Sequence, residues 1–101
     1  NAMLNLDNII NGYEVSDIKG ENNQIIIKYD LDFEKDYYKV RKIFFSSNKL
    51  MVSTINHDSK GISSGKNVIL NNVKEFNVYT KKSLIYFEII TELGESRIRC
   101  I

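Results

Sequence analysis

The feature that most constrains the fold lies in the last third of the chain. Residues 68–79, 84–91 and 96–101 are rich in β-branched and aromatic side chains, and short polar turns at 81–83 and 94–95 separate them. Side chains along a strand point alternately to its two faces, so this alternating pattern predicts strands. The turns are too short for the crossover that parallel neighbours need. The pattern therefore predicts a three-stranded antiparallel meander.

The middle strand of this meander indicates where the core lies. Ile85, Phe87 and Ile89 share one of its faces, and the other face is also largely apolar. A strand that is apolar on both faces is typical of a central strand covered on both sides. The residues that we expect in the core are Phe76, Val78, Ile85, Phe87 and Ile89.

The preceding part of the chain predicts further strands at residues 13–18, 24–30, 37–45 and 50–55. Polar turns at 20–23 and 46–49 lie between them, and the second of these turns predicts a hairpin. Residues 56–67 hold serines, glycines and the only histidine, a composition that predicts an irregular exposed loop.

These patterns predict a single domain of mainly β class, built on a small antiparallel sheet. The 101 residues suffice for one modest core. Residues 1–2 resemble a cloning scar, residues 3–11 predict a short helix or coil, and residues 12–101 form the antiparallel β domain. The class becomes α+β if the segment 3–11 is an ordered helix. No run of about 20 apolar residues occurs, so this sequence predicts no membrane-spanning helix.

Composition argues against some functions. The formal net charge is +1, whereas nucleic-acid-binding domains usually gather a basic excess on one face. We therefore expect the aromatic side chains to fill the core rather than to stack on single-stranded nucleic acid. Cys100 is the single cysteine, so no intrachain disulfide can form. We expect it to be a small buried apolar side chain.

Four carboxylates alternate after the second predicted strand, namely Asp30, Asp32, Glu34 and Asp36. Oxygen ligands at this spacing converge on Ca²⁺ if the segment curls into a loop. However, Lys35 stands where the known helix–loop–helix calcium loop requires glycine, and its charge repels a cation. A solvated acidic loop is the favoured interpretation, and these four residues are the candidate calcium ligands.

The segment around His57 holds the ingredients of a catalytic group without a recognised arrangement. His57 precedes Asp58, and serines follow at 59, 63 and 64, as a Ser–His–Asp grouping would need. Such residues are more typical of turns. One histidine and one distant cysteine do not supply the three or four ligands of a zinc site. Residues 61–66 lack the spacing of a phosphate-binding loop. We therefore expect no catalytic residue, metal or cofactor.

The order of these parts resembles the soluble domain of minor pseudopilins and related type IV pilin-like proteins. The similar groups are the J-like pseudopilins of type II secretion and the competence pseudopilins of Gram-positive bacteria. The segments that carry the resemblance are residues 8–13, 24–29, 40–54, 69–78 and the last two strands around Gly94. The sequence shows no prepilin cleavage motif or hydrophobic helix, and Val52-Ser53-Thr54 lacks an arginine that is frequent in this family.

The resemblance implies a pilin-like fold and a non-enzymatic structural function in secretion, pilus assembly or DNA uptake. It implies other pilin-like subunits or protein cargo as partners, with no small-molecule substrate and no direct nucleic-acid contact. Membrane contact would be made only through an N-terminal helix absent from this sequence. That helix would anchor the domain at the extracytoplasmic cell surface; otherwise we expect a cytoplasmic location.

The exposed segment 56–67 is the expected contact region, because exposed loops often carry binding residues. The candidate contact residues are His57, Asp58, Lys60, Ile62 and Lys66. The alternative function is a small β adaptor that binds a peptide or protein by adding a strand to an exposed sheet edge.

Overall fold

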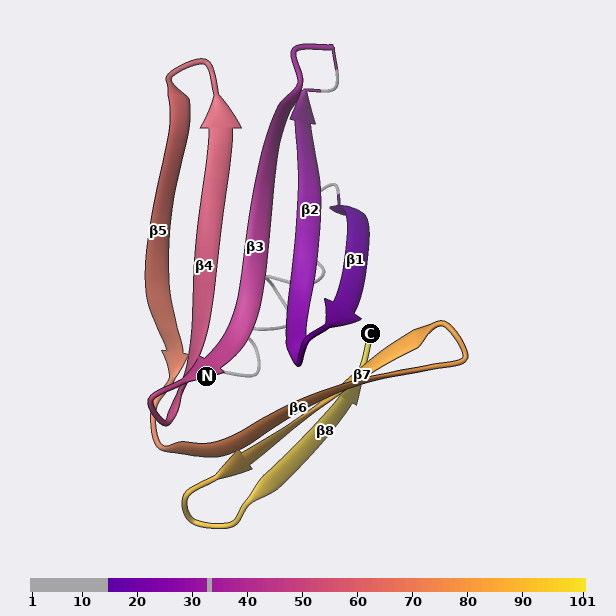
Figure 1. The fold of residues 1–101 in the computed structure, drawn as a ribbon, viewed down its shortest axis with the longest axis vertical. Coiled ribbons are helices and arrows are strands. Elements are labelled where there is room, and N and C mark those ends of the chain that lie inside the picture. The colour runs from indigo at the N-terminus through magenta and orange to yellow at the C-terminus, as the bar shows by residue number, and fades with distance from the viewer. Residues whose placement is uncertain (1–14, 33) are drawn as a thin grey trace.

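The computed structural model describes residues 15–32 and 34–101 (Figure 1). The strands are β1 (Val15–Glu21), β2 (Gln24–Asp32), β3 (Tyr37–Ser46), β4 (Lys49–Asp58), β5 (Gly61–Leu70), β6 (Val73–Lys81), β7 (Leu84–Thr91) and β8 (Ser96–Cys100). Strands β1–β5 form a five-stranded sheet in sequential order, and β6–β8 form a three-stranded sheet. We call them the large and the small sheet. All neighbouring strands pair antiparallel, so the predicted mainly β, antiparallel fold is confirmed.

Tight two-residue loops connect several of the hairpins. Both loop residues have positive φ in three of them: Asn22-Asn23, Ser47-Asn48 and Lys82-Ser83. Positive φ at both central positions is characteristic of the type I′ turn, whose twist matches that of the flanking strands. Asparagine tolerates this conformation better than most side chains. The turns predicted within residues 20–23, 46–49 and 81–83 are therefore confirmed, although Gly20 itself belongs to β1.

One face of the large sheet, which we call its inner face, carries the buried side chains of that sheet. Ile25, Ile27 and Tyr29 of β2 are buried there, which confirms the predicted face of this strand. The register pairs Ile25 with Ile43 of β3 and Ile43 with Val52 of β4. Three adjacent strands therefore supply one continuous apolar row.

The small sheet confirms most of the predicted core. Four of the five residues predicted for the core are buried in this sheet, namely Phe76, Ile85, Phe87 and Ile89. Val78 is partly buried and packs against the core from β6. Strand β7 is central in its sheet, but Leu84 on its other face is 45% exposed. Tyr86, Glu88 and Ile90 on that face are only partly buried. Within the described part of the chain, β7 is thus fully buried on one face alone, and the expectation that it is covered on both is wrong.

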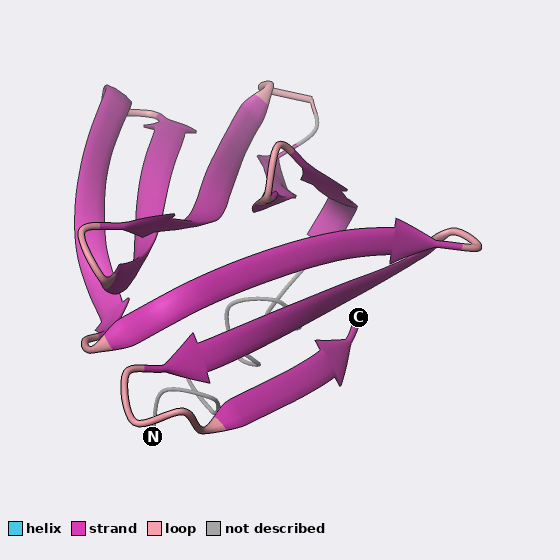
Figure 2. Ribbon diagram, turned by 60° about the horizontal axis from the view of Figure 1, so that its bottom comes forward, coloured by secondary structure: helices cyan, strands magenta, loops and turns pink. Residues whose placement is uncertain are grey.

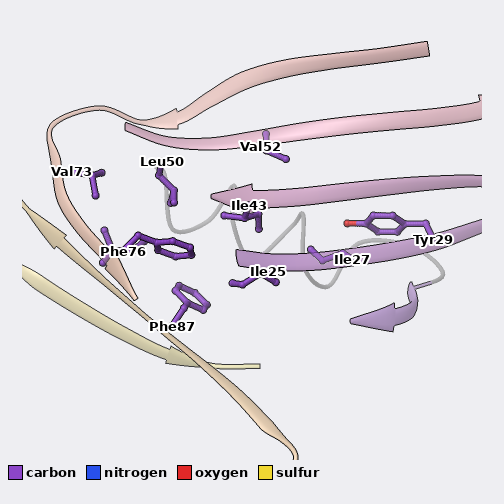
Figure 3. Close-up of a cluster of buried hydrophobic side chains, with 10 residues drawn as sticks. Ile25, Ile27, Tyr29, Ile43, Leu50, Val52, Val73, Phe76 and Phe87 are labelled. Atoms are coloured by element: carbon purple, nitrogen blue, oxygen red, sulfur yellow. The ribbon is translucent and has the colours of Figure 1, made fainter. Parts of the chain in front are cut away.

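The two sheets meet at one end of the large sheet, where the small sheet lies across the strand ends (Figure 2). The buried cluster at this junction comprises Ile25, Ile27, Tyr29, Ile43, Leu50, Val52, Val73, Phe76, Phe87 and Ile89. Figure 3 shows that both sheets contribute to it, with the Phe76 and Phe87 rings 6.3 Å apart between their centroids. Removal of this apolar surface from water, worth about 25 cal/mol per Å², is what holds the sheets together.

Polar contacts fix the position of the small sheet. The Asn23 side chain donates from Nδ2 to the Phe76 carbonyl oxygen at 2.6 Å and accepts from the Val78 N–H at 2.7 Å. The amide of Asn23 thus pairs with the free edge of β6 as a peptide group of a neighbouring strand would. The Val73 N–H donates to the Asn48 carbonyl oxygen at 2.9 Å and provides a second link between the sheets.

The prediction of an irregular loop at residues 56–67 is wrong. Strand β4 continues to Asp58 and β5 begins at Gly61, so this region is a long hairpin. The predicted first meander strand, 68–79, is also wrong, because it is divided between the two sheets. The chain leaves the large sheet after Leu70, turns through Asn72 with φ of 59°, and enters the small sheet at Val73.

Cys100 is exposed, so the expectation that it is buried is wrong. It shares a face with Tyr86, its partner on β7, and this face lies opposite the buried cluster. The expected scar at residues 1–2, the helix or coil at 3–11 and the first two residues of the strand predicted at 13–18 lie outside the described residues.

Candidate interaction surface

The hairpin of β4 and β5 carries the five residues predicted to contact a partner. His57 and Asp58 end β4, Lys60 lies in the turn, and Ile62 and Lys66 lie on β5. The register and the alternation of side chains place His57, Ile62 and Lys66 on the outer face of the large sheet, opposite the buried cluster. Asp58 falls on the inner face. The structure therefore gathers three of these residues on one surface and separates Asp58 from His57.

Asp58 has a structural role in the hairpin turn. Its Oδ1 accepts the Lys60 N–H at 2.9 Å, and its Oδ2 accepts Asn56 Nδ2 at 2.7 Å. Gly61 follows with φ of 102°, a conformation that favours glycine. The Asp58 carboxylate thus stabilises the turn and does not orient His57.

His57 is held by the region that precedes β3. Its Nδ1 lies 3.0 Å from the Asp36 carbonyl oxygen, a hydrogen bond that requires the proton on Nδ1. The imidazole contacts the rings of Tyr37 and Tyr38, with centroids 5.8 Å and 5.2 Å away. These contacts join the C-terminal end of β4 to the start of β3.

The structure does not assemble a Ser–His–Asp group from these residues. Ser63 pairs with Asn56 and Ser64 with Ile55 across the hairpin, so neither serine is the cross-strand partner of His57. Successive strand residues point to opposite faces, so His57 and Asp58 also point apart. Among the described residues, His57 hydrogen-bonds the Asp36 carbonyl rather than a serine hydroxyl.

The candidate calcium ligands also stay apart. No three acidic, histidine or cysteine side chains gather into a metal site within residues 15–32 and 34–101. Asp32 instead accepts the N–H groups of Glu34 and Lys35 with its Oδ1, at 3.1 Å and 3.3 Å. Side-chain acceptance of this kind stabilises a turn. Asp30 and Asp32 thus belong to the end of β2, Glu34 and Asp36 to the connection that follows, and Asp32 stabilises the turn.

The outer face of β3–β5 is cationic. The register places Lys42, Ser53 and Lys66 in one row across these three strands. Lys49 starts β4 on the same face, and the described strands β3–β5 place no carboxylate there. We call Lys42, Lys49 and Lys66 the lysine face. Lys66 Nζ lies 6.0 Å from the centroid of the Phe44 ring, within the range of a cation–π contact.

Apolar side chains surround the lysine face. Ile55, Ile62 and Val68 are 41%, 71% and 45% exposed. Single exposed apolar residues are ordinary, but a group of them on one face is typical of an interaction surface. Ile62 and Lys66 were predicted to lie in a loop. Ile55 and Val68 were not predicted to lie on this surface, because only the pairing of the strands brings them there.

The free edge of the large sheet borders this surface. Strand β5 is the last strand in the order of the sheet, and all its residues from Gly61 to Val68 are exposed. Open space surrounds Gly65, where an added Cβ would find no atom within 4 Å. An edge strand presents unpaired N–H and C=O groups that can pair with another chain.

A second organised polar group lies on the outer face of the small sheet. The Glu88 carboxylate accepts hydrogen bonds from the Tyr79 hydroxyl at 3.0 Å, Asn77 Nδ2 at 3.3 Å and the Ser96 hydroxyl at 3.2 Å. The Tyr79 hydrogen bond, followed by that of Asn77, lowers the pKa of Glu88. In return the Glu88 carboxylate raises the pKa of Tyr79. This cluster was not predicted, because its members come from three strands and lie together only in the folded sheet.

No described helix is long and apolar enough to cross a membrane. Comparisons of the chain with known proteins give no matching family model, no matching curated protein and no matching solved structure.

Proposed function

We propose that this domain is a non-enzymatic structural subunit, the soluble domain of a pilin-like protein acting in secretion, pilus assembly or DNA uptake. The observation that best supports the proposal is the distribution of burial. The buried cluster lies where the sheets meet, while the outer face of β3–β5 and the edge of β5 remain open. Open faces and edges suit a subunit that other proteins contact.

The sequence resemblance supplies the pilin-like part of the proposal. It rests on the order of hydrophobic segments, including the run 69–78 that leads from β5 into β6. In this view an N-terminal helix packs into a fibre and anchors the domain at the extracytoplasmic cell surface. Other pilin-like subunits or protein cargo then contact the large sheet.

A test of the pilin-like assignment is the coding sequence upstream of Met3. We expect about 20 consecutive apolar residues preceded by a prepilin cleavage motif. Protease treatment of intact cells should then remove the domain, because it lies outside the membrane. A natural start at Met3 together with full protection inside intact cells would contradict the assignment.

The second candidate function is a β adaptor that binds a peptide by strand addition. The length and exposure of β5 favour it, since an added strand gains backbone hydrogen bonds along the whole edge. An enzymatic role centred on the histidine is tested by His57→Ala. Retention of the full biological activity of the protein by this variant would exclude catalysis at His57.

A further inference from the structure

We propose that the edge of β5 binds an extended segment of a partner protein whose outward side chains are acidic beside Lys66 and apolar beside Ile62 and Val68. The inference rests on the proposed function only in that the domain works by binding proteins. It holds for a pilin-like subunit and for an adaptor alike.

The other sheet edges of the described chain are less open than β5. At β6, Asn23 already pairs with Phe76 and Val78. Strand β1 is interrupted by an irregularity between Val15 and Asp17. Irregularities and charges of this kind protect an edge from pairing.

The remaining two edges differ in length and charge. Strand β8 has five residues and carries Arg97 and Arg99. Strand β5 has ten residues and, between Gly61 and Val68, keeps a regular register with β4. It has Lys66 as its single charged residue and contains no proline. Strand β5 is therefore the edge best able to accept a strand.

The charge of the adjoining surface selects the partner. A strand added beside β5 places its side chains about 5 Å from those of β5 on the same face. One of them lies beside Lys66, which continues the row of Lys42 and Ser53. The outer face of β3–β5 has no carboxylate that could pair with Lys66. An acidic side chain of the partner at that position is therefore attracted by the lysine, whereas a basic one is repelled.

The neighbouring positions of β5 define the rest of the pattern. Ile62 and Val68 lie on the same face as Lys66, at 71% and 45% exposure, and lose apolar surface to water when a partner side chain covers them. On the inner face β5 presents Gly61, Ser63, Gly65 and Asn67, and the space beside the two glycines is open to partner side chains. The outer positions of β5 are, in order, Ile62, Ser64, Lys66 and Val68. A segment with apolar, acidic, acidic and apolar residues at alternate positions therefore places an acidic side chain beside Lys66 in either strand direction.

A second copy of this chain is the competing occupant of the edge. Pairing of β5 with another β5 places two lysine faces side by side in one continuous sheet. Like charges at that separation repel, so the chemistry favours a foreign acidic strand over self-association. A dimer joined through β5 would therefore contradict the proposal.

The test uses a synthetic peptide of about nine residues, in which valine, glutamate, glutamate and valine alternate with threonine. Its control carries lysine in place of both glutamates. Amide resonances of the ¹⁵N-labelled protein are followed during titration. We expect the glutamate peptide to shift resonances of β5 and to slow hydrogen exchange of its outward amides. The lysine peptide should bind roughly tenfold more weakly or not at all.

Charge reversal on the protein tests whether the lysines select the acidic peptide. In Lys42→Glu/Lys66→Glu we expect the glutamate peptide to lose roughly tenfold in affinity and the lysine peptide to gain. Both lysines are exposed, so the thermal unfolding temperature of the double variant should remain close to that of the original protein. Equal binding of both peptides by both proteins would overturn the proposal.

Proline substitution tests whether the peptide pairs with the backbone at the edge of β5. Neighbouring N–H groups of β5 point alternately toward β4 and outward, so Ser63→Pro and Ser64→Pro differ in which side loses a donor. The variant that keeps its thermal stability is the one that lost the outward donor, and it should lose peptide binding. Unchanged binding in this variant, or shifts confined to the small sheet, would overturn the proposal. Neither result affects the upstream-sequence test, so failure here is distinguishable from failure of the pilin-like assignment.

Discussion

Gly20 and Val78 approach so closely that a Cβ at position 20 would lie 2.8 Å from Val78 Cγ1. Gly20 lies near the end of β1, and Val78 lies on β6 of the other sheet. The contact is therefore part of the junction of the sheets. Glycine is needed at this position for its lack of a side chain, not for an unusual backbone conformation.

We expect Gly20→Ala to lower the free energy of unfolding by about 1–2 kcal/mol. Overpacking costs about 1–3 kcal/mol, and the better strand propensity of alanine offsets about 0.5–1 kcal/mol of it. Val78 is β-branched and stiff, so it yields little. Urea denaturation measures the change. The double variant Gly20→Ala/Val78→Ala should lose less than the sum of the single variants, and strict additivity would refute the clash.

Asn23→Gly should destabilise the protein by about 1–3 kcal/mol, because the Phe76 carbonyl and the Val78 N–H lose their partner at the sheet junction. Glycine keeps the positive φ of this turn position. The matched control is Asn22→Gly, at the neighbouring turn residue, with an expected change within about 0.5 kcal/mol. Equal effects of the two substitutions in chemical denaturation would show that the amide link contributes nothing.

Phe87→Ala should cost about 3–5 kcal/mol, since its side chain is 1% exposed at the centre of the buried cluster. Leu84→Ala, on the open face of the same strand, should cost less than about 1 kcal/mol. Denaturant unfolding of both variants measures the difference. A loss below about 1 kcal/mol for Phe87→Ala would mean that the strand face is assigned wrongly.

Glu88 should make stability depend on pH. Its pKa in the folded protein is lowered by the Tyr79, Asn77 and Ser96 donors, so its contribution is present above the ordinary glutamate pKa. That contribution is lost as pH falls from this value through the lowered pKa of the folded state. The stability difference between the original protein and Glu88→Gln should shrink over that range. In an NMR titration Tyr79→Phe should move the pKa of Glu88 upward, and an unchanged value would contradict the assigned cause.

The elements that alternation could reveal were predicted well. Ile25, Ile27 and Tyr29 were placed on one face of β2 although the apolar Ile26 lies between two of them, and all three are buried. Ile85, Phe87 and Ile89 were likewise placed on one face of β7, and they are buried too. Turn composition also identified the hairpins, since asparagine and serine tolerate the left-handed conformation found there.

Strand β5, which has no covered face over most of its length, was missed. From Gly61 to Val68 both faces of β5 are exposed, so nothing in that stretch distinguishes a strand from a loop. Strand β8 was predicted at residues 96–101 from its alternation, although the structure leaves both of its faces exposed. The contact surface was found only in part for the same reason. His57, Ile62 and Lys66 share a face through pairing, which is a property of the hairpin rather than of local composition.

The placement of the buried cluster at one end of the large sheet makes the opposite end of the β4–β5 hairpin independent of the core. Ser59 and Lys60 form its tip and contact none of the clustered side chains. Peptide insertions or fluorescent labels at this tip should leave the junction intact. The domain thus offers an attachment point from which occupancy of the neighbouring edge can be reported in living cells.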